Sequence, residues 1–149
     1  MRWMLLNILM VVVTLLSATG TVRANDLVRI SNAWIREGPP ITTVLAGYAK
    51  AENLSGQEIV LIGATSPDFA AVEFHRTDIV NGLARMREEG QIKLPRGAAV
   101  SFHPGGRHMM LINPRRTLKA GENVRVELRL GNGQIIRIDV PVRRQAPDG

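Results

Sequence analysis

Alternation of apolar and polar residues, repeated along most of the chain, is the feature that most restricts the fold. In residues 124–130 four apolar side chains alternate with charged ones, and residues 136–142 repeat the pattern after the turn sequence Gly131-Asn132-Gly133. Side chains two apart on a strand share a face, so these segments predict a β-hairpin with one buried and one solvent-facing side. No segment keeps helical spacing for three turns, which argues against a helical fold.

Short segments of the same kind recur between turn sequences rich in glycine and proline. The other predicted strands are residues 27–35, 44–52, 58–64, 71–77, 83–87, 91–94, 98–103 and 108–112. The 149 residues are enough for one domain of ordinary size and too few for two. Together these features predict an all-β, Greek-key β-sandwich in a single domain.

The first 24 residues have the character of a secretory signal peptide. Arg2 gives a positive start, residues 4–16 are almost entirely apolar, and Ala24 is a small residue at the end of the segment. The apolar run is too short to span a bilayer. We therefore expect cleavage after Ala24, export to the periplasm without stable membrane insertion, and one domain formed by residues 25–149.

Cysteine content and charge exclude several classes of protein. The sequence has no cysteine, which excludes disulfides, thiolate nucleophiles, cysteine-ligated zinc and the thiolate-bound copper of electron-transfer cupredoxins. The formal net charge is +6, and it falls to about +4 without Arg2 and Arg23. Aromatic residues make up only 4%, and no long basic run is present, so we expect no nucleic-acid partner.

Beyond the predicted signal peptide, all histidines and methionines lie within one stretch of the chain. They are His75, Met86, His103, His108, Met109 and Met110. Imidazole and thioether groups are neutral, and the thioether sulfur is a soft ligand. Two of each therefore favour Cu(I) over zinc or harder ions. A neutral ligand set does not offset the charge of the metal, so we expect an exchangeable site suited to transport.

Local geometry places four of these residues on two strand faces. Asn81-Gly82 is typical of a two-residue hairpin turn, and the register counted outward from it makes His75 and Met86 diagonal neighbours on one face. His108 and Met110 are two apart and share a face of a later strand. A metal can be held between the two segments only if they meet in the fold, which the sequence alone does not show.

The two remaining residues of this stretch are expected to have ordinary roles. Met109 points to the opposite face from His108 and Met110, which predicts core packing. His103 lies outside the spacing and just before a turn, which predicts a surface histidine.

The four residues resemble the signature of the periplasmic copper chaperones of the PCuAC family. That signature is His, ten residues, Met, twenty-one residues, His, one residue, Met, and His75, Met86, His108 and Met110 satisfy it without a gap. The stretch Ser31-Asn32-Ala33-Trp34 is similar to an early Asp-Ala-Trp stretch of the family, with asparagine in place of aspartate. Arg107 stands where the family often has tyrosine.

The resemblance implies a cupredoxin-like sandwich that binds Cu(I) through His75, Met86, His108 and Met110. It also implies a copper-accepting partner, such as the CuA centre of cytochrome c oxidase subunit II, or another periplasmic copper chaperone. We expect a monomeric copper carrier rather than an enzyme.

Two other functions remain open on the sequence. Glu73 and His75 share a strand face, and His108 could complete a two-histidine, one-carboxylate site of a metalloenzyme, although the methionines are then unexplained. A metal-free, secreted β-sandwich that binds another molecule would make the clustering incidental. A serine hydrolase is disfavoured because no Gly-x-Ser-x-Gly sequence is present.

Overall fold

The computed structural model describes residues 27–147, so the predicted signal peptide lies outside the described residues. Within this range the chain forms a succession of β-strands. They are β1 (Val28–Arg36), β2 (Val44–Asn53), β3 (Ile59–Thr65), β4 (Phe69–Val80), β5 (Leu83–Glu88), β6 (Ile92–Leu94), β7 (Ala99–Phe102), β8 (Arg107–Pro114), β9 (Asn123–Leu130) and β10 (Ile135–Arg143). Most bounds lie within two residues of the prediction, and β4 is longer than expected at both ends.

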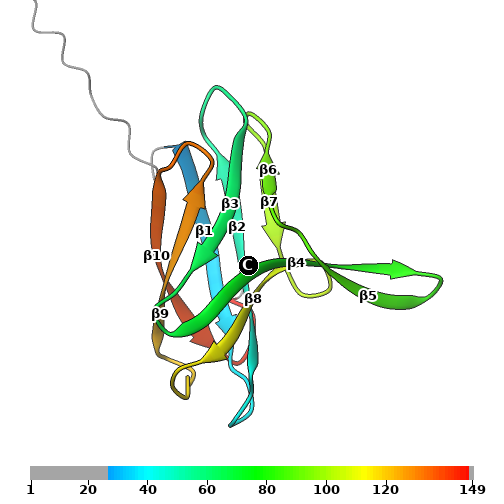
Figure 1. The fold of residues 1–149 in the computed structure, drawn as a ribbon, viewed down its shortest axis with the longest axis vertical. Helices are drawn as coiled ribbons and strands as arrows, with labels where there is room; N and C mark the ends of the chain where they lie inside the picture. The colour runs from blue at the N-terminus through cyan, green and yellow to red at the C-terminus, as the bar shows by residue number, and fades with distance from the viewer. Residues whose placement is uncertain (1–26, 148–149) are drawn as a thin grey trace, which may run out of the picture.

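The strands wrap around one core in the order β5-β4-β8-β7-β2-β1-β10-β9-β3-β6 (Figure 1). A further pairing between β3 and β4, at Ala64 and Val72, closes the sheet on itself. β1 pairs with β10 in parallel and β7 with β8 in parallel, whereas the other neighbours are antiparallel. The predicted all-β Greek-key sandwich is confirmed.

Alternation along the strands builds the core as expected. In the β9–β10 hairpin, Val124, Val126 and Leu130 are fully buried, and Val140 lies opposite Val124 on the same inner face. The charged residues between them lie on the other face, where cross-strand ion pairs join Arg125 to Asp139 at 3.1 Å and Arg137 to Glu127 at 2.8 Å. This hairpin therefore has the one buried and one wet side that its sequence predicts.

One buried polar side chain, that of Asn53 at the end of β2, ties three segments together. Its Nδ2 donates to the carbonyl oxygens of Gln57 at 2.7 Å, Leu94 at 2.8 Å and Pro95 at 3.2 Å. Its Oδ1 accepts from the backbone nitrogen of Ser55 at 2.9 Å and from the hydroxyl of that residue at 2.7 Å. The side chain thus has hydrogen-bond partners for both of its polar atoms, as a buried amide requires.

The turn between β4 and β5 has the geometry that its sequence predicts. Asn81 and Gly82 both have positive φ, at 53° and 76°, as a two-residue hairpin turn of the primed type requires. The resulting register pairs Thr77 with Met86 and His75 with Glu88, as predicted from the turn.

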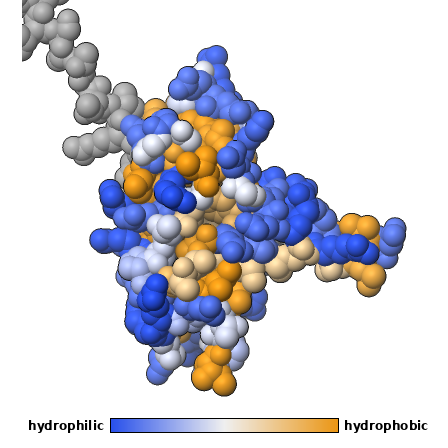
Figure 2. All heavy atoms as spheres, in the orientation of Figure 1, coloured by the Kyte–Doolittle hydropathy of each residue, from blue (hydrophilic) through white to orange (hydrophobic). Residues whose placement is uncertain are grey.

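The outer half of β4 and the whole of β5 form an arm that projects from the barrel (Figure 1). Ile79 and Met86 lie on one face of the arm and are 69% and 57% exposed. Figure 2 shows hydrophobic side chains near the end of the arm beside hydrophilic ones closer to the barrel. The other face carries an ion-pair cluster in which Asp78 accepts from Arg76 at 2.8 Å and from Arg87 at 3.0 Å.

This cluster predicts an acid-sensitive arm. Hydrogen bonds from Arg87 and Arg76 lower the pKa of Asp78, so its contribution to stability is present above the unfolded pKa and is lost as the pH falls through the folded value. We expect the backbone chemical shifts of β5 to change on acidification below about pH 4. In the Asp78→Asn variant this change should be much smaller. An equal change in that variant would contradict a role for the carboxylate.

Candidate metal centre

β4 and β8 lie side by side, and their register places two histidines directly opposite each other. His75 pairs with His108 across the antiparallel ladder, so the two imidazoles share one face of the sheet. Their ring centroids are 6.0 Å apart, and the ring planes are inclined by 34°. The two segments that the sequence left unconnected therefore meet, although they lie 33 positions apart in the chain.

Met110 lies on the same face, one diagonal step from His75. It is opposite Glu73 of β4 on one side and Ala46 of β2 on the other, and its side chain is half-buried. Its position is fixed because β8 has a paired strand on each side.

Met86 lies on the same face but on the projecting arm. It is opposite Thr77, one step outward from His75, and is 57% exposed. An exposed position on an edge strand excludes a core-filling role for this methionine. The structure thus groups His75, His108 and Met110 on the barrel and leaves Met86 as the outermost member of the face.

The ring nitrogens of the two histidines have different surroundings. Nε2 of His75 is 2.8 Å from Oε2 of Glu73, whereas its Nδ1 is buried and has no hydrogen-bond partner among the described residues. Nδ1 of His108 is 3.1 Å from the carbonyl oxygen of Gly106. That carbonyl also accepts from the backbone nitrogen of Thr77 at 3.1 Å, which joins the turn before β8 to β4.

The spacing of the two rings fits a shared metal ion. Two imidazoles that bind one metal at about 2.0–2.1 Å from each nitrogen have ring centres roughly 5–6 Å apart. The observed 6.0 Å lies at the upper end of that range. A buried ring nitrogen without a partner carries a desolvation cost that a bound ion would remove. The geometry therefore allows a metal to lie between β4 and β8 with a thioether from Met110 beside it.

A site built from histidines and a carboxylate alone is not supported. Within residues 27–147 no group of three or more histidine, aspartate or glutamate side chains is arranged to hold a metal ion. Glu73 is close to the pair, but its carboxylate contacts the ring of His75 at 2.8 Å. A metal site on this face would therefore need ligands of another kind, and the thioethers of Met86 and Met110 lie on the same face.

Met109 and His103 have the ordinary roles that the sequence predicts. Met109 is 2% exposed and packs in the core opposite Phe74, and His103 is an exposed residue whose Nδ1 is 3.0 Å from the carbonyl oxygen of Pro104. Arg107 alternates with His108 and lies opposite Arg76. It forms a two-pronged ion pair with Glu89, with distances of 2.6 and 3.2 Å.

Two contributors to the face were not identified as such from the sequence. In the sequence Glu73 is a candidate only as a metal ligand, although its two-residue spacing from His75 is also the spacing at which side chains on a strand can hydrogen-bond. The carbonyl of Gly106 cannot be recognised from the sequence, because the pattern of side chains gives no signal for a backbone acceptor.

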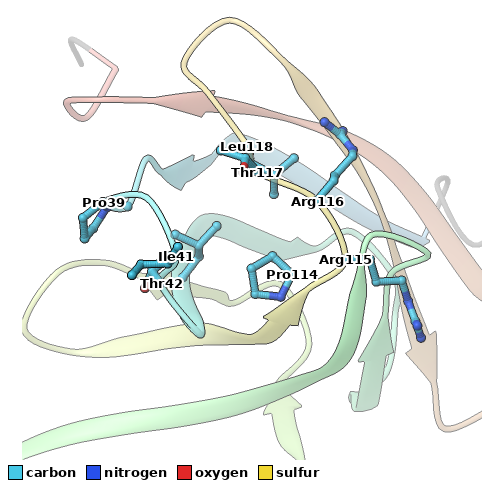
Figure 3. Close-up of a pocket in the computed structure, with 10 residues that line it drawn as sticks. Pro39, Ile41, Thr42, Pro114, Arg115, Arg116, Thr117 and Leu118 are labelled. Carbon is cyan, nitrogen blue, oxygen red and sulfur yellow. The ribbon is translucent and has the colours of Figure 1, made fainter.

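A separate pocket lies elsewhere on the barrel, between the β1–β2 connection and the segment after β8 (Figure 3). Its volume is about 250 Å³, and Ile41, Pro114 and Leu118 contribute apolar lining. Arg116 is paired with Asp68 and Glu122, and its guanidinium group points away from the apolar part of the pocket in Figure 3. None of the four predicted ligands lines it, so this pocket is not part of the candidate centre.

The fold and the site define a class: a closed β-sandwich domain with two histidines and two methionines on one outer face of the sheet. A family model described as putative lipoprotein LpqE-like matches residues 28–142, and the chain belongs to this family. A curated relative, the putative lipoprotein Lxx21020 of Leifsonia xyli subsp. xyli, is 30% identical over 119 residues, which is 79% of this chain and 70% of the relative.

Solved structures of PCuAC domains have the same fold. The copper-bound PCuAC domain from PmoF2 is 26% identical, with a TM-score of 0.66 over 81% of this chain and 94% of that domain. The Cu(I) form of DR1885 from Deinococcus radiodurans is 26% identical, with a TM-score of 0.65 over 78% of each chain. Among residues 27–147 there is no helix with the length and apolar character needed to cross a membrane.

Proposed function

We propose that this protein is a copper carrier that binds one Cu(I) ion through His75, Met86, His108 and Met110 and passes it to an acceptor by ligand exchange. The observation that carries the proposal is the cross-strand pair of His75 and His108, in which the buried Nδ1 of His75 has no partner among the described residues. Imidazole and thioether together form a soft, neutral set that suits Cu(I).

The comparisons support this proposal. Two of the similar solved domains are in copper-bound form, and one of these is described as the Cu(I) state. Both are 26% identical to this chain over more than three quarters of its length. The match of fold and the match of ligand spacing are separate observations that point to the same chemistry.

The exposure of Met86 supports transfer rather than storage. Met86 is 57% exposed, so an incoming ligand from an acceptor can reach the ion from the side of the arm. We propose that the protein acts in the periplasm after removal of residues 1–24. The proposed acceptor is a copper protein such as cytochrome c oxidase subunit II at its CuA centre, or another periplasmic copper chaperone.

An anaerobic competition titration tests Cu(I) binding. The chain from Asn25 onward is expected to bind one equivalent tightly, and the His108→Ala/Met110→Leu double variant is expected to lose that binding. The matched control is His103→Ala/Met109→Leu, which removes the same two residue types outside the face and should bind as the parent does. Leucine is close to methionine in volume, so both double variants should remain folded.

Each outcome of the titration has a clear meaning. Tight binding that is lost only in the first variant would support the copper site. Absence of Cu(I) binding by the parent would contradict the copper proposal and favour a metal-free binding module. Equal loss in both variants would show that the face is not the site.

A further inference from the structure

The ring of His75 is held by a residue that is outside the proposed ligand set. Glu73 precedes it by two positions on β4 and lies on the same face, and Oε2 of Glu73 is 2.8 Å from Nε2 of His75. Among the described residues this is the one side-chain hydrogen bond that Glu73 forms. Its side chain is 37% exposed, whereas that of His75 is 13% exposed.

This contact determines which nitrogen of His75 carries the proton. An ionised carboxylate can only accept a hydrogen bond, so in the neutral ring the proton is on Nε2 and the lone pair is on Nδ1. Nδ1 is the buried atom without a partner. The only nitrogen of His75 with a free lone pair therefore lies on the buried side of the ring.

The ring of His108 is held in the opposite tautomer. A carbonyl oxygen can only accept, so the contact of 3.1 Å between Nδ1 of His108 and the oxygen of Gly106 places the proton on Nδ1 and the lone pair on Nε2. The two rings that face each other across β4 and β8 are thus fixed in different tautomers. The tautomer of His75 is fixed by the side chain of Glu73 on the same strand, and the tautomer of His108 is fixed by the carbonyl of Gly106 in the turn before β8.

We infer that Glu73 is a positioning residue that makes Nδ1 of His75 and Nε2 of His108 the two nitrogen donors to copper. The inference rests on the proposed function for the identity of the metal, and it adds the donor atoms and the residue that selects one of them. A histidine that binds a metal commonly donates its second ring N–H to a carboxylate or carbonyl, which orients the ring and raises its basicity. Glu73 and Gly106 supply one such acceptor each.

Glu73 also places a negative charge beside a neutral ligand set. It lies opposite Met110 in the register and next to His75, so it faces two of the proposed ligands. Orientation and charge make separable contributions. Glutamine keeps an oxygen that can accept from Nε2 but removes the charge, whereas alanine removes both.

The test compares three variants of the purified protein with the parent: Glu73→Ala, Glu73→Gln and Glu88→Ala. Glu88 lies opposite His75 on β5, and its carboxylate forms no hydrogen bond or ion pair with the described residues. Glu88→Ala therefore removes one negative charge near His75, as Glu73→Ala does, but leaves the hydrogen bond to the His75 ring in place. Long-range proton–nitrogen correlation spectra show which ring nitrogen is protonated and, after addition of Cu(I), which nitrogen binds.

In the parent we expect protons on Nε2 of His75 and Nδ1 of His108, and copper on the other nitrogen of each ring. Glu73→Ala should lower Cu(I) affinity by about 10–100-fold, the usual effect of losing an outer-shell partner. Glu73→Gln should recover most of the loss and keep Nδ1 of His75 as the donor. Glu88→Ala should retain both the donor atoms and the affinity of the parent.

The failure of this inference differs from the failure of the proposed function. Stoichiometric Cu(I) binding by the parent through Nε2 of His75 would overturn the role of Glu73 and leave the copper site intact. If Glu73→Ala and Glu88→Ala lowered Cu(I) affinity equally, Glu73 would act only through its charge and the positioning role would be overturned. Absence of Cu(I) binding by the parent would remove the proposed function itself.

Discussion

Replacing Asn53 by alanine is expected to lower the free energy of unfolding by about 2–4 kcal/mol, because the change removes every hydrogen bond that its buried side chain donates and accepts. Its Nδ2 donates to three carbonyl oxygens, from the β2–β3 connection and from the end of β6. The residue is 1% exposed, so water cannot replace these bonds without local rearrangement. Urea denaturation followed by circular dichroism measures the loss.

Two further variants show whether the loss comes from the donor. Asn53→Asp keeps the size of the side chain but turns a carboxylate oxygen toward carbonyl oxygens, so it should destabilise at least as much as alanine. Asn123→Ala, at an exposed position at the start of β9, should change stability by less than about 0.5 kcal/mol. If the Asn53→Asp variant were as stable as the parent, the hydrogen-bond explanation would be refuted.

The second large effect concerns the two methionines of the face, which are expected to differ. Met110→Leu should lower Cu(I) affinity by a larger factor than the loss of an outer-shell partner does, which is about 10–100-fold. Met110 is half-buried on a strand that is paired on both sides, so its sulfur is held in place before the ion arrives. Met86→Leu should have a smaller effect, because an exposed side chain on the arm must be ordered on binding.

Met109→Leu is the matched control for this comparison, since it changes the same residue type on the opposite face of β8. Its Cu(I) affinity should equal that of the parent, and each methionine-to-leucine change should cost less than about 1.5 kcal/mol of stability. Competition titration and thermal unfolding measure the two quantities. An effect of Met86→Leu as large as that of Met110→Leu would contradict the difference in pre-organisation.

The parts of the site that depend on local sequence were predictable. Asn81-Gly82 determines the turn, the turn determines the register, and the register places His75 and Met86 on one face. The same period of two separates Met109, in the core, from Met110, on the face. These relations follow from backbone geometry over a few residues and require no knowledge of the remaining strands.

The parts that depend on distant segments were not predictable. The pairing of β4 with β8 brings His75 opposite His108, and no short-range pattern specifies which of the many strands will be neighbours. β4 extends from Phe69 to Val80, beyond its predicted bounds, because it pairs successively with β3, β8 and β5. Asn53 gave no signal in the sequence, because two of its acceptors lie more than 40 positions away.

The proposed site lies partly on the projecting arm and partly on β4 and β8, and these parts are expected to differ in their resistance to local unfolding. Every side chain of β5 is exposed and one of its edges is unpaired, so its backbone amides are expected to exchange with solvent sooner than those of β8. Transient opening of β5 would withdraw Met86 while the groups on β4 and β8 stay in place. The lifetime of an ion bound at the proposed site would then be governed by a low-energy fluctuation of one hairpin rather than by global unfolding of the domain.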